Sequence, residues 1–171
     1  MKKSPRQMKD SLATFREYMR LERRRAAGLS PEEFKRWETL RRSLDRVVGP
    51  LDSRSSSEKR ATPRVPTSLK VSFENLREMG EVLMSNLSRG GVFVAIDPPP
   101  PIGTELKLRI QIVDPPRELV LGGEVASLHV GPRFEVNNRG IGIRFVNLSR
   151  EDQALVDELY EEQVEEYLGA Q

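Results

Sequence analysis

The spacing of apolar residues changes once along this chain of 171 residues, and that change limits the folds open to it. Up to about residue 48, apolar side chains recur every three or four positions, which is the period of an amphipathic helix. From Ser68 onward they alternate with polar residues, which is the period of a half-buried strand. The sequence therefore predicts a helical segment followed by a mainly β domain.

Two helices are predicted in the first segment. The first covers about residues 6–27, and its apolar stripe comprises Met8, Leu12, Phe15 and Met19. Gly28 suits the turn after it, and Ser30 with Glu33 forms a capping box at the start of the second helix. The second stripe comprises Trp37, Leu40, Leu44, Val47 and Leu51, although Gly49-Pro50 should end the helix before the last of these.

Both stripes are narrow, which is typical of one helix facing another. We interpret residues 6–48 as a helical hairpin whose stripes face each other or a partner copy. Two readings stay open: an appendage packed on its own domain, and a surface for self-association or a protein partner. The run Arg23-Arg24-Arg25 raises a third, nucleic acid, but Glu17 and Glu22 interrupt the basic face and we do not expect it.

The strands of the second segment are short. Leu69, Val71 and Phe73 alternate with polar neighbours in the first of them. Further strands are predicted at 80–86, 91–96, 104–113, 118–130 and 140–147, separated by turns rich in proline and glycine. Strands of this length and spacing indicate a barrel or a sandwich.

A final helix is predicted after Ser149, which can cap it together with Asp152. One side of this helix is apolar, and eight acidic residues lie between Glu151 and Glu166. We expect the helix to plug or flank the β domain.

The formal net charge of +2 conceals an asymmetry. Residues 1–57 carry 15 Lys and Arg against 8 Asp and Glu, a net charge of +7, whereas residues 58–171 carry 13 against 18, a net charge of −5. The basic segment could meet nucleic acid, anionic lipid or an acidic partner, or the acidic remainder of its own chain.

Composition excludes several kinds of chemistry. The chain has no cysteine and a single histidine, His129, so disulfides, thiolate metal sites and the usual Ser/His or Cys/His catalytic systems are not expected. We therefore expect no enzyme, no metal site and no cofactor. No apolar run approaches the roughly 20 residues needed to cross a bilayer, and no signal-peptide stretch follows Met1, so a cytoplasmic protein is expected.

Two segments have the residues of an anion site. Arg60 and Arg64 follow a serine-rich stretch, residues 50–59, that is typical of a flexible linker. Each arginine offers a planar fork of donors that fits a phosphate or a guanine edge, and two forks on one short loop can grip a flat, multiply charged ligand.

The second segment supplies hydrogen-bonding groups and space. Asn86 and Ser88 can donate and accept hydrogen bonds, while Gly90 and Gly91 let a ligand approach the backbone, at what we predict to be a strand end. Together the two segments predict an anion-binding pocket.

These segments, in order, resemble a known family. Arg60-x-x-x-Arg64, then Asn86-x-Ser88-x-x-Gly91, then Gly140-Ile-Gly-Ile-Arg-Phe145 is similar to the PilZ domain, the bacterial receptor module for cyclic di-GMP. The resemblance runs from about Glu58 to the chain end and says nothing about residues 1–57. It implies a six-stranded antiparallel β-barrel, which with the C-terminal helix makes a domain over residues 60–171. Periodicity and composition alone place the linker 50–59 and a basic helical hairpin, residues 1–49, before it.

The resemblance also implies roles for the motif residues. Arg60 and Arg64 would hold phosphate and the Hoogsteen edge of one guanine, Asn86 and Ser88 would bond the other guanine, and Gly91 would keep the pocket floor clear. Secondary ligand contacts are assigned to Lys59, Arg89, Gly90 and Arg144.

The function that follows is binding and not turnover. The chain is expected to be a cyclic di-GMP receptor that passes the binding signal through the linker to a protein partner or to self-association through residues 6–48. The alternative is a degenerate PilZ-type adaptor that binds a protein partner without nucleotide. The family commonly regulates motility, surface attachment or polysaccharide export.

Overall fold

The structure is a computed structural model that describes residues 5–48, 63–76, 80–130 and 139–170. It divides into two compact units, Met1–Pro66 with Glu161–Gln171, and Thr67–Tyr160. The predicted domain boundaries at residues 49 and 59 lie outside the described residues, so that division stays a prediction. Each unit is described by itself below.

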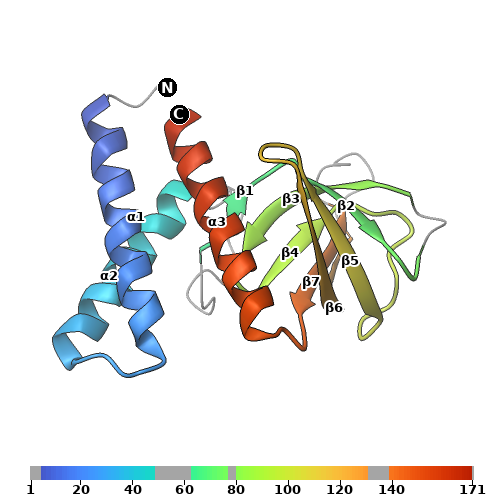
Figure 1. Ribbon diagram of the computed structural model, residues 1–171, viewed down its shortest axis with the longest axis horizontal. Coiled ribbons are helices and arrows are strands. Elements are labelled where there is room, and N and C mark those ends of the chain that lie inside the picture. Colours follow the sequence, from blue (N-terminus) through green and yellow to red (C-terminus); the bar gives the residue numbers. More distant parts are fainter. Residues whose placement is uncertain (1–4, 49–62, 77–79, 131–138, 171) are drawn as a thin grey trace. The chain divides into compact units, whose positions relative to one another are not determined.

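The first unit contains a helical hairpin of α1 (Pro5–Arg25) and α2 (Pro31–Val48) (Figure 1). Gly28, with φ of 98°, makes the left-handed turn that the sequence predicted. The capping box also forms, because the Glu33 N–H donates to Ser30 Oγ at 3.2 Å and the Ser30 N–H donates to Glu33 Oε2 at 3.0 Å. Leu51 and the side chain of Met8 lie outside the described residues.

Trp37 is the largest side chain of α2 in the core of this unit. Its ring stacks on Tyr18 of α1 with centroids 6.4 Å apart, although the predicted stripe of the first helix did not include Tyr18. Its indole Nε1 donates to the carboxylate of Glu22 at 2.6 Å, which pairs a carboxylate that is almost fully buried. The buried apolar residues of the unit are Phe15, Tyr18, Met19, Leu21, Trp37, Leu40, Leu44, Val48, Val65, Val164 and Leu168.

The second unit is a closed antiparallel barrel of six strands, in the order β3-β2-β5-β6-β7-β4, with β3 pairing β4 to close it. These strands are β2 (Lys70–Phe73), β3 (Val82–Ser88), β4 (Gly91–Val94), β5 (Glu105–Ile112), β6 (Arg117–His129) and β7 (Gly140–Phe145). The predicted barrel is thus confirmed. A short extra strand, β1 (Val65–Pro66), was not predicted.

Every second side chain along the strands points inward, and these side chains fill the barrel. In β5, the residues predicted to face inward are buried and their neighbours are not; the buried ones are Leu106, Leu108, Ile110 and Ile112. They meet inward residues of the neighbouring strands, as in the pairs Val71 with Ile110 and Leu108 with Leu121.

The last helix is α3 (Arg150–Ala170), and its predicted cap is present: the Asp152 N–H donates to Ser149 Oγ at 3.0 Å. Its residues up to Tyr160 belong to the barrel unit, and those from Glu161 belong to the unit of α1 and α2. The sequence-based division had given the whole helix to the barrel. In the helical unit, Arg16 pairs with Glu165 at 3.4 Å and Arg23 pairs with Glu161, so basic and acidic faces of the chain do meet.

The sequence also led us to expect no membrane-spanning segment. Within the described ranges, no helix combines the length and the apolar character needed to cross a membrane.

Candidate ligand-binding site

The second motif segment forms the hairpin between β3 and β4. Asn86 and Ser88 lie within β3, Arg89 and Gly90 form the turn, and Gly91 is the first residue of β4. The prediction that β3 ends at residue 86 was wrong, because the strand continues to Ser88, where the residue pairs with Gly91. The Ser88 hydroxyl donates to the Gly91 carbonyl oxygen at 3.2 Å across that pair. The motif is therefore a tight hairpin.

A bulge decides which way the motif side chains face. Met84 and Leu87 are both fully buried although they are three residues apart, and the register of β3 shifts between Met84 and Asn86. One extra residue in a strand resets its alternation. Because Leu87 points inward, Asn86 and Ser88 on either side of it both point out of the barrel.

Cross-strand partners extend this outward surface over β4 and β7. Ser88 pairs with Gly91, which pairs with Arg144, and Asn86 pairs with Phe93, which pairs with Gly142. Directly opposed residues share a face of the sheet. We call this surface the motif face; it comprises Asn86, Ser88, Gly91, Phe93, Gly142 and Arg144. Asn86, Ser88 and Gly91 are half-buried and Arg144 is exposed, whereas Phe93 and Gly142 are buried.

Packing of the strands requires glycine at position 91, independently of the ligand role predicted for it. A Cβ at this position would lie 2.1 Å from the carbonyl oxygen of Ile143 and 3.2 Å from the Cα of Arg144, both on β7. Only glycine lets β4 approach β7 so closely. Gly90 differs, since a Cβ there would meet nothing within 4 Å.

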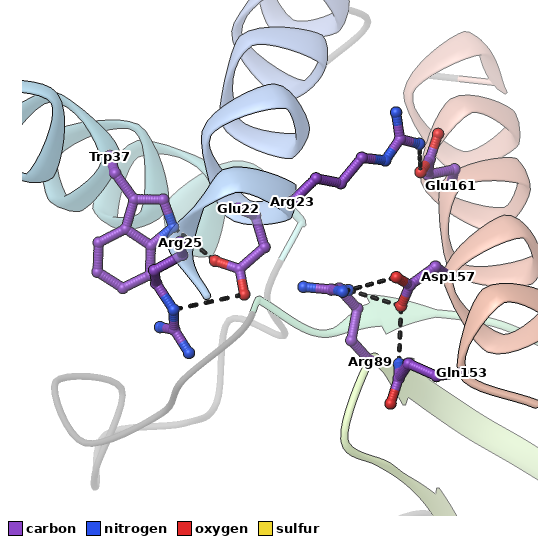
Figure 2. A network of polar contacts seen from close by, with 8 residues as sticks. All are labelled: Glu22, Arg23, Arg25, Trp37, Arg89, Gln153, Asp157 and Glu161. Atoms are coloured by element: carbon purple, nitrogen blue, oxygen red, sulfur yellow. Dashed lines mark hydrogen bonds and ion pairs between the residues drawn. The ribbon is translucent and has the colours of Figure 1, made fainter. Parts of the chain in front are cut away.

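Arg89 makes the strongest polar contact of the hairpin. Its Nε and Nη2 donate to the two carboxylate oxygens of Asp157 on α3 at 2.7 and 2.6 Å, as Figure 2 shows. The side chains of Arg89 and Asp157 are 16% and 19% exposed, so the pair is largely shielded from water. Gln153 supports it by donating to Asp157 at 2.8 Å. Sequence reasoning placed Arg89 near the ligand but missed Asp157, whose only signal was the acidic face of the last helix.

Arg144 has a weaker partner. Its guanidinium lies 3.0 Å from Glu124 and its side chain is 62% exposed, which makes an ordinary ion pair on a strand face. Its register opposite Gly91 nevertheless places it on the motif face.

The structure brings together the barrel residues of the predicted site, namely Asn86, Ser88, Gly90 and Gly91, with Arg89 and Arg144 beside them. Arg64 is half-buried, precedes β1 and belongs to the helical unit. Lys59 and Arg60 lie outside the described residues. The assignment of all these residues to the ligand stays a prediction.

In the barrel, a shifted pKa is found away from the motif face, in the cluster of Glu74, Lys107 and Arg109. A hydrogen bond from Lys107, and then one from Arg109, lowers the pKa of Glu74. Among the described residues, no group of three or more His, Cys, Asp or Glu side chains is placed to hold a metal ion. The motif face presents arginine, amide and hydroxyl groups, which is chemistry for binding an anion that has hydrogen-bonding edges.

A family model described as the PilZ domain matches residues 58–162. The chain belongs to the PilZ family. The match includes both motif segments, the barrel and the start of α3, and it leaves out α1 and α2. The resemblance seen in the sequence is thereby confirmed.

Solved structures show the same fold. The Bacillus subtilis inhibitor of motility MotI/DgrA matches with 20% identity over 62% of this chain and 51% of its own, with a TM-score of 0.52. This chain therefore spans about half of that protein's length. The PilZ domain of YcgR from Escherichia coli, solved with cyclic di-GMP, matches with 13% identity over 63% of this chain and 93% of its own, with a TM-score of 0.51. No curated protein matches the chain.

Proposed function

We propose that this PilZ protein is a receptor for cyclic di-GMP. One observation carries the proposal: the bulge in β3 turns Asn86 and Ser88 outward, next to the turn where Gly90 leaves open space, in a chain of this family. A polar, glycine-floored surface on a barrel is suited to a flat ligand that offers hydrogen-bonding edges. The chemistry required is binding and not catalysis.

Cyclic di-GMP carries two phosphate charges and two guanine bases. We assign phosphate and a guanine Hoogsteen edge to Arg60 and Arg64, because an arginine fork can bond either one through two parallel hydrogen bonds. Asn86 and Ser88 would bond the second guanine. Lys59, Arg89, Gly90 and Arg144 would make secondary contacts.

The signal would pass through residues 50–59. This segment joins the motif arginines to the helical hairpin, and a segment that is ordered by its ligand can transmit binding to what lies beyond it. The receiver would be a protein partner or a second copy that contacts residues 6–48. Nucleic acid fits the hairpin less well, because Arg24 and Arg36 already pair with carboxylates of the same unit at 2.6 and 2.7 Å.

Isothermal titration of cyclic di-GMP into the purified chain tests the receptor, with GTP and cyclic di-AMP as ligand controls. Replacing Arg60 or Arg64 by alanine should weaken binding by about ten-fold to a hundred-fold, since each removes charge-assisted hydrogen bonds of roughly 1.5–3 kcal/mol. Arg64→Lys should not restore it, because an ammonium lacks the planar fork. Arg42→Ala is the matched control, an arginine of α2 whose side chain is 63% exposed. Equal binding by R60A, R64A and the parent chain would refute the assignment.

The contact between Arg89 and Asp157 favours a second candidate. An arginine in the motif turn that is already paired with a carboxylate fits an adaptor that binds a protein partner without nucleotide. The same titration separates the two. A folded chain that binds none of the three nucleotides would discard the receptor and leave the adaptor.

A further inference from the structure

Arg89 occupies the turn of the motif hairpin, between Ser88 and Gly91, and its donor fork is already in use. Its two parallel hydrogen bonds to Asp157, at 2.7 and 2.6 Å, have the bidentate geometry with which an arginine also binds phosphate. A carboxylate and a phosphate cannot occupy the same fork at once. Asp157 thus fills a position that an anionic ligand at this turn would require.

The carboxylate does not depend on Arg89 alone. Gln153, one turn earlier on α3, donates to the same Oδ1 of Asp157 at 2.8 Å, and about a fifth of the Asp157 side chain is exposed to water. If Arg89 turned away, Asp157 would keep an amide donor and gain solvent. The cost of separating the pair is therefore lower than for a fully buried one.

The first half of α3 has another attachment to the barrel unit, because Arg117 of β6 pairs with Glu158 at 3.2 Å. Three apolar side chains of the same stretch, Val156, Leu159 and Tyr160, are each 1% exposed. Loss of the Arg89 contact would free the motif turn while these contacts keep the helix folded and packed. The pair can open without unfolding the unit.

We propose that Asp157 is an internal competitor for the nucleotide, holding the Arg89 fork until a phosphate group of cyclic di-GMP displaces it. This inference rests on the proposed receptor function. The exchange replaces one singly charged oxyanion by another, so the charge of Arg89 stays paired in both states. By linkage, a carboxylate that must be displaced lowers ligand affinity, and bound ligand weakens the hold of α3 on the motif turn by the same factor.

Asp157→Asn tests the competition by titration with cyclic di-GMP. It keeps the shape of the side chain and removes its charge, and it should tighten binding by about ten-fold, the worth of roughly one charge-assisted hydrogen bond. Glu158→Gln is the matched control. It makes the same charge change one residue later, where the partner is Arg117, and should leave the affinity within about two-fold, since it touches no motif residue.

The gain must also depend on Arg89. Arg89→Ala should weaken binding, and adding Asp157→Asn to it should bring no further tightening, because the competitor then has nothing to hold. Equal or weaker binding by D157N, or a gain that persists without Arg89, would overturn the inference and leave the receptor standing. Absence of nucleotide binding by the parent chain would instead overturn the receptor, and the competition with it.

A measurement on the unaltered chain guards against variants that fold poorly. The Nε–Hε resonance of Arg89, assigned by comparison with Arg89→Lys, should move when cyclic di-GMP is added to saturation, because its acceptor changes from carboxylate to phosphate. A resonance that stays in place while the nucleotide binds would show that the pair with Asp157 is permanent.

Discussion

The two compact units use arginine in opposite ways. In the helical unit, Arg24 and Arg36 extend over the surface, 55% and 54% exposed, and pair with carboxylates of the facing helix. In the barrel unit, Arg89 is 16% exposed and makes two parallel hydrogen bonds to the carboxylate of Asp157. Exposed pairs of this kind each contribute little to stability, whereas the shielded pair of Arg89 and Asp157 lies at the motif turn. The number of arginines in a segment is therefore a poor guide to which arginine is shielded from water.

The cores differ as well. The helical unit buries polar groups with its aromatic residues, because the Glu22 carboxylate lies against the indole of Trp37. The barrel core is aliphatic and aromatic, and its closure depends on how closely strand backbones approach, as at Gly91. Substitutions should accordingly damage the two units by different means.

The largest effect is expected at Trp37. Trp37→Ala removes a ring that stacks on Tyr18 and the indole donor that bonds the buried carboxylate of Glu22, so it should cost about 3–5 kcal/mol of the helical unit's stability. Urea unfolding followed by far-ultraviolet circular dichroism measures the loss. Phe34→Ala is the control on the same helix, 51% exposed, and should cost far less. Similar losses for both would contradict the role given to Trp37.

A smaller effect is expected at the barrel hairpin, where two neighbouring glycines can be compared. Gly91→Ala forces β4 away from the backbone of β7 and should cost about 1–3 kcal/mol. Gly90→Ala places its methyl group in open space and should leave the unfolding midpoint nearly unchanged. The same denaturant titration checks both, and equal destabilisation would show that the approach of the strands is not what requires glycine.

Capping boxes allow a test with the same chemistry in each unit. Ser30 caps α2 and Ser149 caps α3 through equivalent hydrogen bonds of 3.2 and 3.0 Å. Each serine-to-alanine change should cost roughly 1 kcal/mol. Hydrogen exchange should show the loss at the start of the altered helix in each variant. A loss in S30A that appears in the barrel strands would contradict the division into two units.

The smallest effect is expected from acid. A hydrogen bond from Arg36 is the main reason that the pKa of Glu17 lies below its ordinary value of 4.5. A carboxylate whose folded pKa is depressed contributes stability above its unfolded pKa, and this contribution is lost as the pH falls through the folded pKa. The midpoint for unfolding of the hairpin should therefore decline below about pH 4.5. Arg36→Gln should flatten that decline, whereas Arg42→Gln, whose partner Glu38 is on the same helix, should keep it.

Local signals predicted much of this fold. The helical period, the turn at Gly28, both capping boxes and the alternation in β5 depend on residues a few positions apart, and all were recovered. These local features were accessible because each is decided by short-range geometry. The resemblance to the family indicated the barrel, and the assignment of its motif residues to a ligand stays a prediction.

The remaining features depend on long-range contacts. The bulge before Asn86 is fixed by how β3 pairs with β4, so the predicted strand ended two residues early. Arg89 and Asp157 are 68 positions apart, and nothing local marks that carboxylate among the eight acidic residues of its helix. The grouping of the end of α3 with α1 and α2 is likewise invisible to periodicity. A single sequence contains no record of such pairings.

The close approach of β4 to β7 has a consequence for reading related sequences. Because a side chain at Gly91 would collide with the backbone of β7, the barrel itself demands that glycine, whether or not a nucleotide ever binds. A descendant that had abandoned its ligand would be free to lose Asn86, which faces outward, and would still retain Gly91. The glycine of the motif therefore reports the fold, while the outward-facing Asn86 would report on the ligand of the proposed receptor.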